Sequence, residues 1–158
     1  MTNVSNTRIT ELAVSRDIAA DPVAVYNAIS DVTRMGEWSP ECHTCEWLDG
    51  ATTAAVGATF QGENANNGNA WSITNTITAA EPGEKFAFDC SVPQFTFASW
   101  GYEIEATDGG CRVTETWKDH RTDEMANRPS ISGVEDRADF NRQSMETTLE
   151  KVAAALEN

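Results

Sequence analysis

The stretch GVEDRADFNRQSMETTLEKVAAALEN (133–158) decides the fold of this 158-residue chain. Apolar residues recur along one side of it at helical spacing, and neither glycine nor proline follows Gly133. The stretch therefore predicts one long amphipathic helix, whose apolar side has to be covered by another layer of structure. That side consists of Val134, Ala138, Met145, Leu149, Val152 and Leu156.

The layer predicted to cover the helix is an antiparallel sheet. From residue 43 to 120, short segments of alternating polar and apolar residues are separated by turn residues such as NANNGN (64–69) and TDGG (107–110). Short breaks rich in glycine and asparagine favour hairpins over crossover helices, so these segments form a meander. A further alternating segment, RITELAVSRDI (8–18), adds one strand before it. The meander strands are expected at 43–49, 58–64, 70–80, 84–92, 95–106 and 111–120.

Two short helices are predicted between the first strand and the meander. In DPVAVYNAIS (21–30), Asp21 is suited to cap a helix that starts at Pro22 and runs to about residue 30. The following DVTRMGEW (31–38) predicts one more turn, which ends at Gly36. The predicted class is α+β, with a seven-stranded curved antiparallel sheet wrapped around the long C-terminal helix. We expect residues 1–7 to form an N-terminal tail and residues 8–158 a single domain, because the length suits one core.

Composition narrows the range of partners. Eleven lysines and arginines against 25 aspartates and glutamates give a net charge of −14, which repels nucleic acids and anionic membranes. No apolar run approaches the roughly 20 residues that span a bilayer. The opening MTNVSNTRIT lacks the apolar stretch that is typical of a signal peptide. We therefore expect a cytoplasmic protein without stable membrane insertion and without nucleic-acid partners; the sequence leaves a homodimer open.

Several segments, taken in order, resemble a known superfamily. IAADPVAVYNAISD (18–31) is followed by WSPE (38–41), by WGYEIEATDGGCRVTETW (100–117) and by the terminal amphipathic helix. Over about Arg8 to Leu156 this order resembles the START-like helix-grip (SRPBCC) superfamily, in its bacterial polyketide cyclase/dehydrase-like branch. The resemblance implies a deep, mostly apolar cavity between sheet and helix. Members use such a cavity to hold lipids, sterols, aromatic polyketides or plant hormones, and a minority catalyse cyclisation or dehydration there. The superfamily offers no invariant catalytic set, so the fold alone supplies no mechanism.

Three polar residues interrupt the faces of strands that otherwise read as apolar: Arg16, Asn75 and Glu115. A charge or an amide on a buried face is costly unless it meets a partner or lines a hydrated cavity. We expect these residues to be polar anchors in the ligand pocket. The alternatives are that Arg16 and Glu115 form a structural ion pair, or that the buried face of one strand is assigned wrongly.

Aromatic residues supply a large apolar area on the same faces. Such residues at a spacing of two pack in a core or contact a ligand, and in a hollow fold they do both. The short stretch MGEWSPEC (35–42) adds Trp38, which we expect to cover the end of the cavity, whereas Glu37 and Glu41 are not expected to converge. The predicted ligand contacts besides the polar anchors are Phe60, Trp71, Phe88, Trp100, Tyr102, Trp117 and Met145.

The two histidines and four cysteines offer little chemistry. His120 follows Asp119 at the end of a strand, where it is either a general base or an exposed histidine at the edge of a loop. Cys42 and Cys45 form a C-x-x-C without further zinc ligands at matching spacing, and alternation along a strand would point them to opposite faces. We predict free thiols and no metal site; a metal or redox role for this pair is the less favoured alternative. Phosphate-binding glycine motifs are absent from the sequence, so no cofactor is expected.

The favoured function is binding of a small hydrophobic or aromatic molecule by a non-catalytic carrier or sensor. The alternative is a cofactor-free polyketide cyclase, aromatase or dehydratase. In that enzyme Arg16 would bind a substrate oxygen, Glu115 would act as an acid or base with a pKa raised by desolvation, and Asn75 would orient the substrate. A weaker alternative is a protein-interaction module, which would need an exposed apolar patch.

Overall fold

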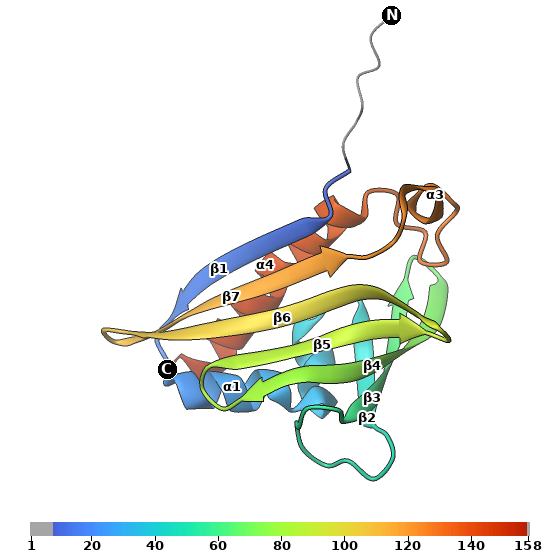
Figure 1. The fold of residues 1–158 in the computed structure, drawn as a ribbon. Coiled ribbons are helices and arrows are strands. Elements are labelled where there is room, and N and C mark those ends of the chain that lie inside the picture. Colours follow the sequence, from blue (N-terminus) through green and yellow to red (C-terminus); the bar gives the residue numbers. More distant parts are fainter. Residues whose placement is uncertain (1–7, 158) are drawn as a thin grey trace, which may run out of the picture.

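The computed structural model describes residues 8–157, and the predicted tail at 1–7 lies outside that range. One antiparallel sheet of seven strands has the order β1-β7-β6-β5-β4-β3-β2 (Figure 1). Strands β2 to β6 each pair with the next strand along the chain, so the predicted meander is confirmed, and β1 joins it beside β7. The strands are β1 Glu11–Ile18, β2 Cys42–Trp47, β3 Thr59–Asn66, β4 Asn69–Glu81, β5 Lys85–Val92, β6 Phe95–Thr107 and β7 Gly110–Asp119.

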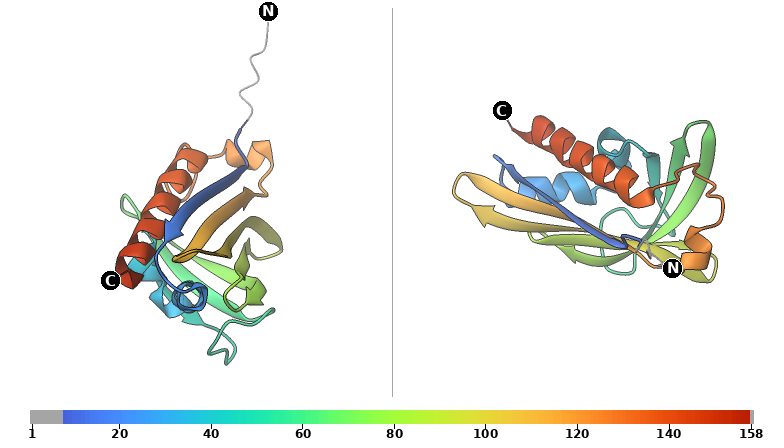
Figure 2. Two further views of the ribbon diagram at one scale, coloured as in Figure 1. Left: turned by 90° about the vertical axis from the view of Figure 1, so that its left-hand side faces the viewer. Right: turned by 90° about the horizontal axis from the view of Figure 1, so that it is seen from above.

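The long helix α4 (Arg137–Leu156) lies along the concave side of the curved sheet (Figure 2). It begins at Arg137 rather than directly after Gly133, because the Asp136 carboxylate accepts a hydrogen bond of 3.0 Å from the backbone N–H of Asp139 and caps the first turn. The predicted α+β helix-grip arrangement is therefore confirmed. The buried side of α4 consists of Ala138, Asn141, Met145, Thr148, Leu149, Val152 and Ala153.

Short helices follow β1 as predicted, with one difference in detail. The Asp21 side chain accepts a bond of 3.1 Å from the backbone N–H of Val23 and caps the first helix where the sequence indicated. The expectation that Gly36 ends the next helix is wrong, because the helix continues past it to Trp38. A Cβ at position 36 would overlap the carbonyl oxygen of His43, so glycine is required for close packing against β2. The elements are α1 Pro22–Ser30, the 3-10 helix η1 Val32–Arg34, α2 Met35–Trp38 and, after β7, the unpredicted α3 Asp123–Ala126.

The core fills the space between the inner face of the sheet and the helices. Phe60, Phe86 and Ile77 contribute fully buried side chains from the sheet, and Met145 and Leu149 contribute them from α4. Among residues 8–157, no helix combines the length and the apolar character that crossing a bilayer requires. The core is incomplete toward one end of α4, and a cavity opens there.

Candidate functional site: a cavity between the sheet and the long helix

A cavity of about 450 Å³ lies between the inner face of the sheet, α2, α4 and the segment that connects β7 to α4. Its size falls in the range of pockets for small molecules. Exposed residues of the connecting segment, Arg128 and Ile131 among them, belong to the wall, so the cavity reaches the surface there. The predicted contacts that line it are Trp71, Asn75, Phe88, Trp100, Tyr102, Glu115 and Trp117.

Glu115 is a buried acid of the cavity wall. Its Oε2 accepts a hydrogen bond of 3.1 Å from the Tyr102 hydroxyl, whereas Oε1 is buried and has no partner. Burial raises the pKa of Glu115 to about 8, although the Tyr102 hydrogen bond acts in the opposite direction. Burial and the neighbouring Glu115 also hold the pKa of Tyr102 well above its usual value. At neutral pH Glu115 is therefore mostly a neutral carboxylic acid, which can donate a hydrogen bond into the cavity.

Asn75 adds a second buried polar group to the wall. It is 5% exposed and lies on β4, opposite Cys90 of β5. Its amide nitrogen is 3.5 Å from the carbonyl oxygen of Phe60, which is a long hydrogen bond. A carboxamide carries two donor hydrogens and an acceptor oxygen, so Asn75 keeps hydrogen-bonding capacity for a ligand.

A network of hydrogen bonds around Arg137 joins the N-terminal end of α4 to other parts of the wall. The Arg137 guanidinium donates to Glu41 at 2.8 Å, to the Asn141 side-chain oxygen at 3.2 Å and to the Ser132 hydroxyl at 2.7 Å. Glu41 Oε2, its second carboxylate oxygen, is buried and unpartnered. Glu41 is 96 residues away from Arg137 in the sequence, and all four residues line the cavity, so the network ties the start of α4 to the segment after α2.

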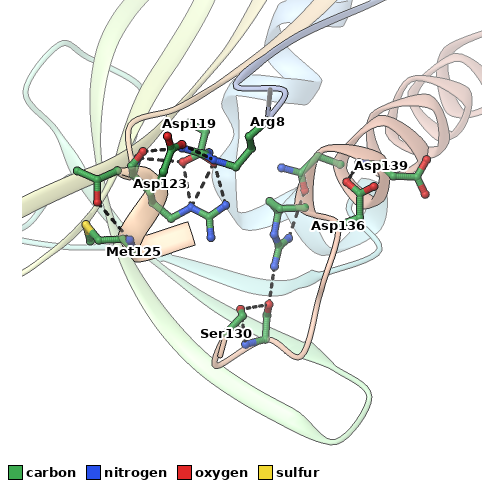
Figure 3. Close-up of polar contacts among 12 residues, drawn as sticks. Arg8, Asp119, Asp123, Met125, Ser130, Asp136 and Asp139 are labelled. Carbon is green, nitrogen blue, oxygen red and sulfur yellow. Dashed lines mark hydrogen bonds and ion pairs between the residues drawn. The ribbon is translucent and has the colours of Figure 1, made fainter. Parts of the chain in front are cut away.

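A second cluster of charges holds the start of the connecting segment. Figure 3 shows Arg8 beside Asp119, at the end of β7, and Asp123 of α3. The Asp119 carboxylate accepts bonds from Arg8 at 2.6 Å and from Arg121 at 2.8 Å, and Asp123 lies 3.2 Å from Arg8. Burial alone would raise the pKa of Asp119, but the hydrogen bonds and charge of Arg121, together with the charge of Arg8, hold it below its usual value. The cluster anchors the start of the connecting segment, which forms part of the cavity wall.

The family model described as "Polyketide cyclase / dehydrase and lipid transport" matches residues 10–157. The chain belongs to this family. No functionally curated protein is similar enough in sequence to count as a match.

Several solved structures share the helix-grip fold of this chain. Protein CV1439 from Chromobacterium violaceum is 18% identical with a TM-score of 0.71, over 95% of this chain and 99% of that one. Major latex-like protein 151 from Panax ginseng is 15% identical with a TM-score of 0.69, over 94% and 97% of the two chains. The di-domain aromatase/cyclase (ARO/CYC) StfQ from the steffimycin biosynthetic pathway is 11% identical with a TM-score of 0.73, over 94% of this chain and 50% of that one. At these identities the likeness extends to the fold alone.

Three of the predicted ligand contacts do not line the cavity of this family member. Phe60 and Met145 are fully buried core residues, and Phe60 packs its ring 5.2 Å from that of Phe88. Arg16 lies opposite the buried Val113, as alternation predicts, but it is exposed and absent from the cavity wall. Because β1 is an edge strand, a long cationic side chain on it can reach water, so neither the pocket role nor an ion pair with Glu115 is formed.

His120 is also separate from the cavity. It is exposed, and its Nε2 lies 2.8 Å from the Ser99 hydroxyl, which in turn donates to Asp89 at 2.6 Å. Asp119, which precedes His120 in the sequence, is paired with Arg8 and Arg121 instead. The structure therefore favours the reading of His120 as an exposed loop-edge histidine over that of a general base for this cavity.

The expectation that Cys42 and Cys45 point to opposite faces is wrong. The pairing of β2 with β3 shifts register between Cys42 and Thr44, and this β-bulge brings both thiols to the inner side of the sheet. Their sulfur atoms are 3.3 Å apart. Within residues 8–157, no group of three or more histidine, cysteine or acidic side chains is arranged to hold a metal ion.

Sequence reasoning missed most of the polar wall on α4. Asn141 and Thr148 lie on the buried side of this helix, among Ala138, Met145 and Val152. They interrupt an apolar stripe at helical spacing, which is the same signal that Asn75 and Glu115 give on strands. Glu41 and Arg137 carried no such signal, because only the folded chain brings them together.

Proposed function

We propose that this protein binds a small, mostly apolar molecule that carries polar oxygen groups, and that it acts as a carrier or sensor of that molecule. One observation carries the proposal. Among residues 8–157, the buried side-chain nitrogen and oxygen atoms without a hydrogen-bond partner are Trp38 Nε1, Glu41 Oε2 and Glu115 Oε1, and all three residues line the cavity.

The energetics explain why these atoms point to a ligand. A buried polar atom without a partner costs about 1–3 kcal/mol, so a molecule that supplies the missing partners binds more tightly by a similar amount. Trp38 Nε1 is a donor, and neutral Glu115 is a second donor, so both suit carbonyl or hydroxyl oxygens. The rings of Trp71, Trp100 and Trp117 would contact the apolar body between such groups.

A matched pair of aromatic probes tests the proposal. Fluorenone and fluorene share one ring skeleton, and only fluorenone has a carbonyl oxygen. Each would be titrated against the neutral fluorescent probe N-phenyl-1-naphthylamine bound in the cavity. We expect fluorenone to displace this probe at about 5- to 10-fold lower concentration, which corresponds to one hydrogen bond of about 1 kcal/mol.

The variant Glu115→Met separates the carboxyl group from general hydrophobicity. It replaces the carboxyl group with an apolar side chain of similar length and removes this hydrogen-bond donor, so the preference for fluorenone should fall to what the remaining donor, Trp38 Nε1, supplies, while fluorene still binds. Absence of binding by all three compounds would refute a ligand cavity. An undiminished preference in Glu115→Met would refute the role of Glu115.

The pKa of Glu115 near 8 also supports a second candidate, a cofactor-free cyclase, aromatase or dehydratase that acts on a polyketide-like substrate. Glu115 would give a proton to a carbonyl or departing hydroxyl oxygen, and Asn75 would orient the substrate. The test is incubation with a linear β-keto thioester, followed by mass spectrometry for loss of water. Turnover that Glu115→Gln abolishes would favour the enzyme, and an unchanged thioester would favour the carrier.

The proposed site of action is the cytoplasm. All four cysteines are buried free thiols, and such thiols persist in a reducing compartment.

A further inference from the structure

Cys42 and Cys45 form a pair of thiols in direct contact beside the ligand cavity. Both side chains are buried, and the distance of 3.3 Å between their sulfur atoms leaves no room for another atom between them. The β-bulge in β2 produces this contact, because without its extra residue the two side chains would lie on opposite faces.

The surroundings of the pair hold the two sulfur atoms together. On β3, Gly62 lies opposite Cys45, and a Cβ there would stand 3.3 Å from the Cys42 sulfur and 3.5 Å from the Cys45 sulfur. Glycine thus leaves space for both thiols. On the other side, the Met35 sulfur lies 3.6 Å from that of Cys45.

The two thiols differ in access and in acidity. Cys42 lines the cavity, whereas Cys45 lies behind it and does not. A hydrogen bond with Cys45 lowers the pKa of Cys42, and burial opposes this effect. The same hydrogen bond, together with burial, raises the pKa of Cys45. A solute that enters the cavity therefore meets the more acidic thiol, Cys42, and the less acidic thiol, Cys45, lies next to it.

We propose that Cys42 and Cys45 form a reversible oxidation site, in which a small peroxide enters through the ligand cavity and converts the two thiols to a disulfide. Cys42 sulfur attacks one oxygen of hydrogen peroxide, which gives Cys42 sulfenic acid and releases one water. Cys45 sulfur then attacks the Cys42 sulfur, which forms the S–S bond and releases the second water. Two thiols are oxidised and one peroxide is reduced to two waters.

The geometry favours this pair over other partners for oxidation. A disulfide requires sulfur atoms about 2 Å apart, so the two sulfur atoms have to move closer together than they are in the reduced protein. The β-bulge makes this movement easier, because strand pairing is already interrupted there. Cys90 also lines the cavity, but no hydrogen bond joins its sulfur to either thiol in the part of the chain that the structure describes. The inference does not depend on the ligand that the cavity holds.

Tryptic mapping of the full-length protein tests the site directly. Cleavage after Arg34, Lys85 and Arg112 gives a peptide 35–85 that contains Cys42 and Cys45, and a peptide 86–112 that contains Cys90 and Cys111. The reduced, folded protein is treated with hydrogen peroxide, then denatured and alkylated with N-ethylmaleimide. We expect peptide 35–85 to lose both alkylation sites and to regain them after dithiothreitol, while peptide 86–112 keeps both.

Two variants assign the order of the steps, and a third is the control. Cys45→Ser should leave Cys42 as a sulfenic acid that dimedone traps, and Cys42→Ser should abolish oxidation of peptide 35–85. Cys111→Ser removes a buried thiol elsewhere and should behave as the wild type. Alkylation of both thiols after peroxide treatment of the wild type would overturn the proposal, and so would a disulfide that joins the two peptides. The tryptic peptide map of the wild-type protein tests for the disulfide even if a serine variant fails to fold.

Discussion

Replacement of Glu115 by glutamine should remove a large pH dependence of folding stability. Burial raises the pKa of this carboxyl from an ordinary value near 4.5 to about 8. Because the folded state holds the proton more tightly, the stabilisation is fully present below about pH 4.5 and is lost as the pH rises toward 8. The shift of about 3.5 pKa units corresponds to at most about 5 kcal/mol, of which about 4 kcal/mol falls between pH 5 and pH 9.

Glutamine is the matched replacement because it has the shape of glutamic acid and cannot ionise. Its side-chain oxygen can still accept the hydrogen bond of 3.1 Å that Tyr102 donates to Glu115. The free energy of unfolding of Glu115→Gln should therefore fall by about 4 kcal/mol less than that of the wild type between pH 5 and pH 9. For a protein of ordinary stability, about 5–15 kcal/mol, this is a large fraction of the total.

Urea unfolding followed by tryptophan fluorescence at pH 5, 7 and 9, at fixed ionic strength, measures this difference. Glu103→Gln is the control, because Glu103 lies on β6 next to Tyr102 and makes the same glutamate-to-glutamine change at an exposed position. Its stability should follow the wild-type pH curve. If Glu115→Gln also runs parallel to the wild type, Glu115 is not a buried neutral acid, and the argument for a hydrogen-bond donor in the cavity fails.

Three further substitutions test separate parts of the structure. Gly36→Ala should lower the free energy of unfolding by about 1–3 kcal/mol in urea titrations, because its Cβ would overlap the backbone of His43; an unchanged midpoint would show that α2 and β2 are not in close contact. Trp38→Ala should cost about 3–5 kcal/mol and weaken binding of N-phenyl-1-naphthylamine, since this buried indole lines the cavity; normal melting with normal probe binding would place Trp38 elsewhere. Asp119→Asn should destabilise the protein at pH 7 but much less near pH 2, because the lowered pKa of Asp119 gives stability that is lost as the carboxylate is protonated; an equal loss at both pH values would contradict the ion pairs with Arg8 and Arg121.

Regular alternation explains which parts of the fold could be predicted from sequence. Asn75 and Glu115 lie on strands that have neighbours on both sides, so an inward position along the strand meant burial. Arg16 also lies at an inward position along its strand, but that strand is at the edge of the sheet, and the Arg16 side chain is exposed.

The other errors arise where tertiary contacts override a local rule. A bulge shifts the strand register at Cys42, and nothing in the residues before Thr44 announces that extra residue. Gly36 was assigned to a helix end, a common place for glycine, but the structure requires glycine there because another strand passes close to it. Both positions depend on how β2 approaches the short helices, which local periodicity does not encode.

The polar groups of the cavity wall differ in what they can offer a ligand. Arg137 already donates to Glu41, Asn141 and Ser132, so a ligand oxygen that binds it has to replace an existing hydrogen bond and gains little. Glu115 Oε1 and Trp38 Nε1 have no hydrogen bond to lose. A ligand that pairs with them therefore removes the full free-energy cost of leaving these atoms unpartnered, and its binding is stronger by that amount. Selection among apolar molecules of similar size should therefore depend on where their oxygens meet Glu115 and Trp38, while the Arg137 network sets the shape of the wall around them.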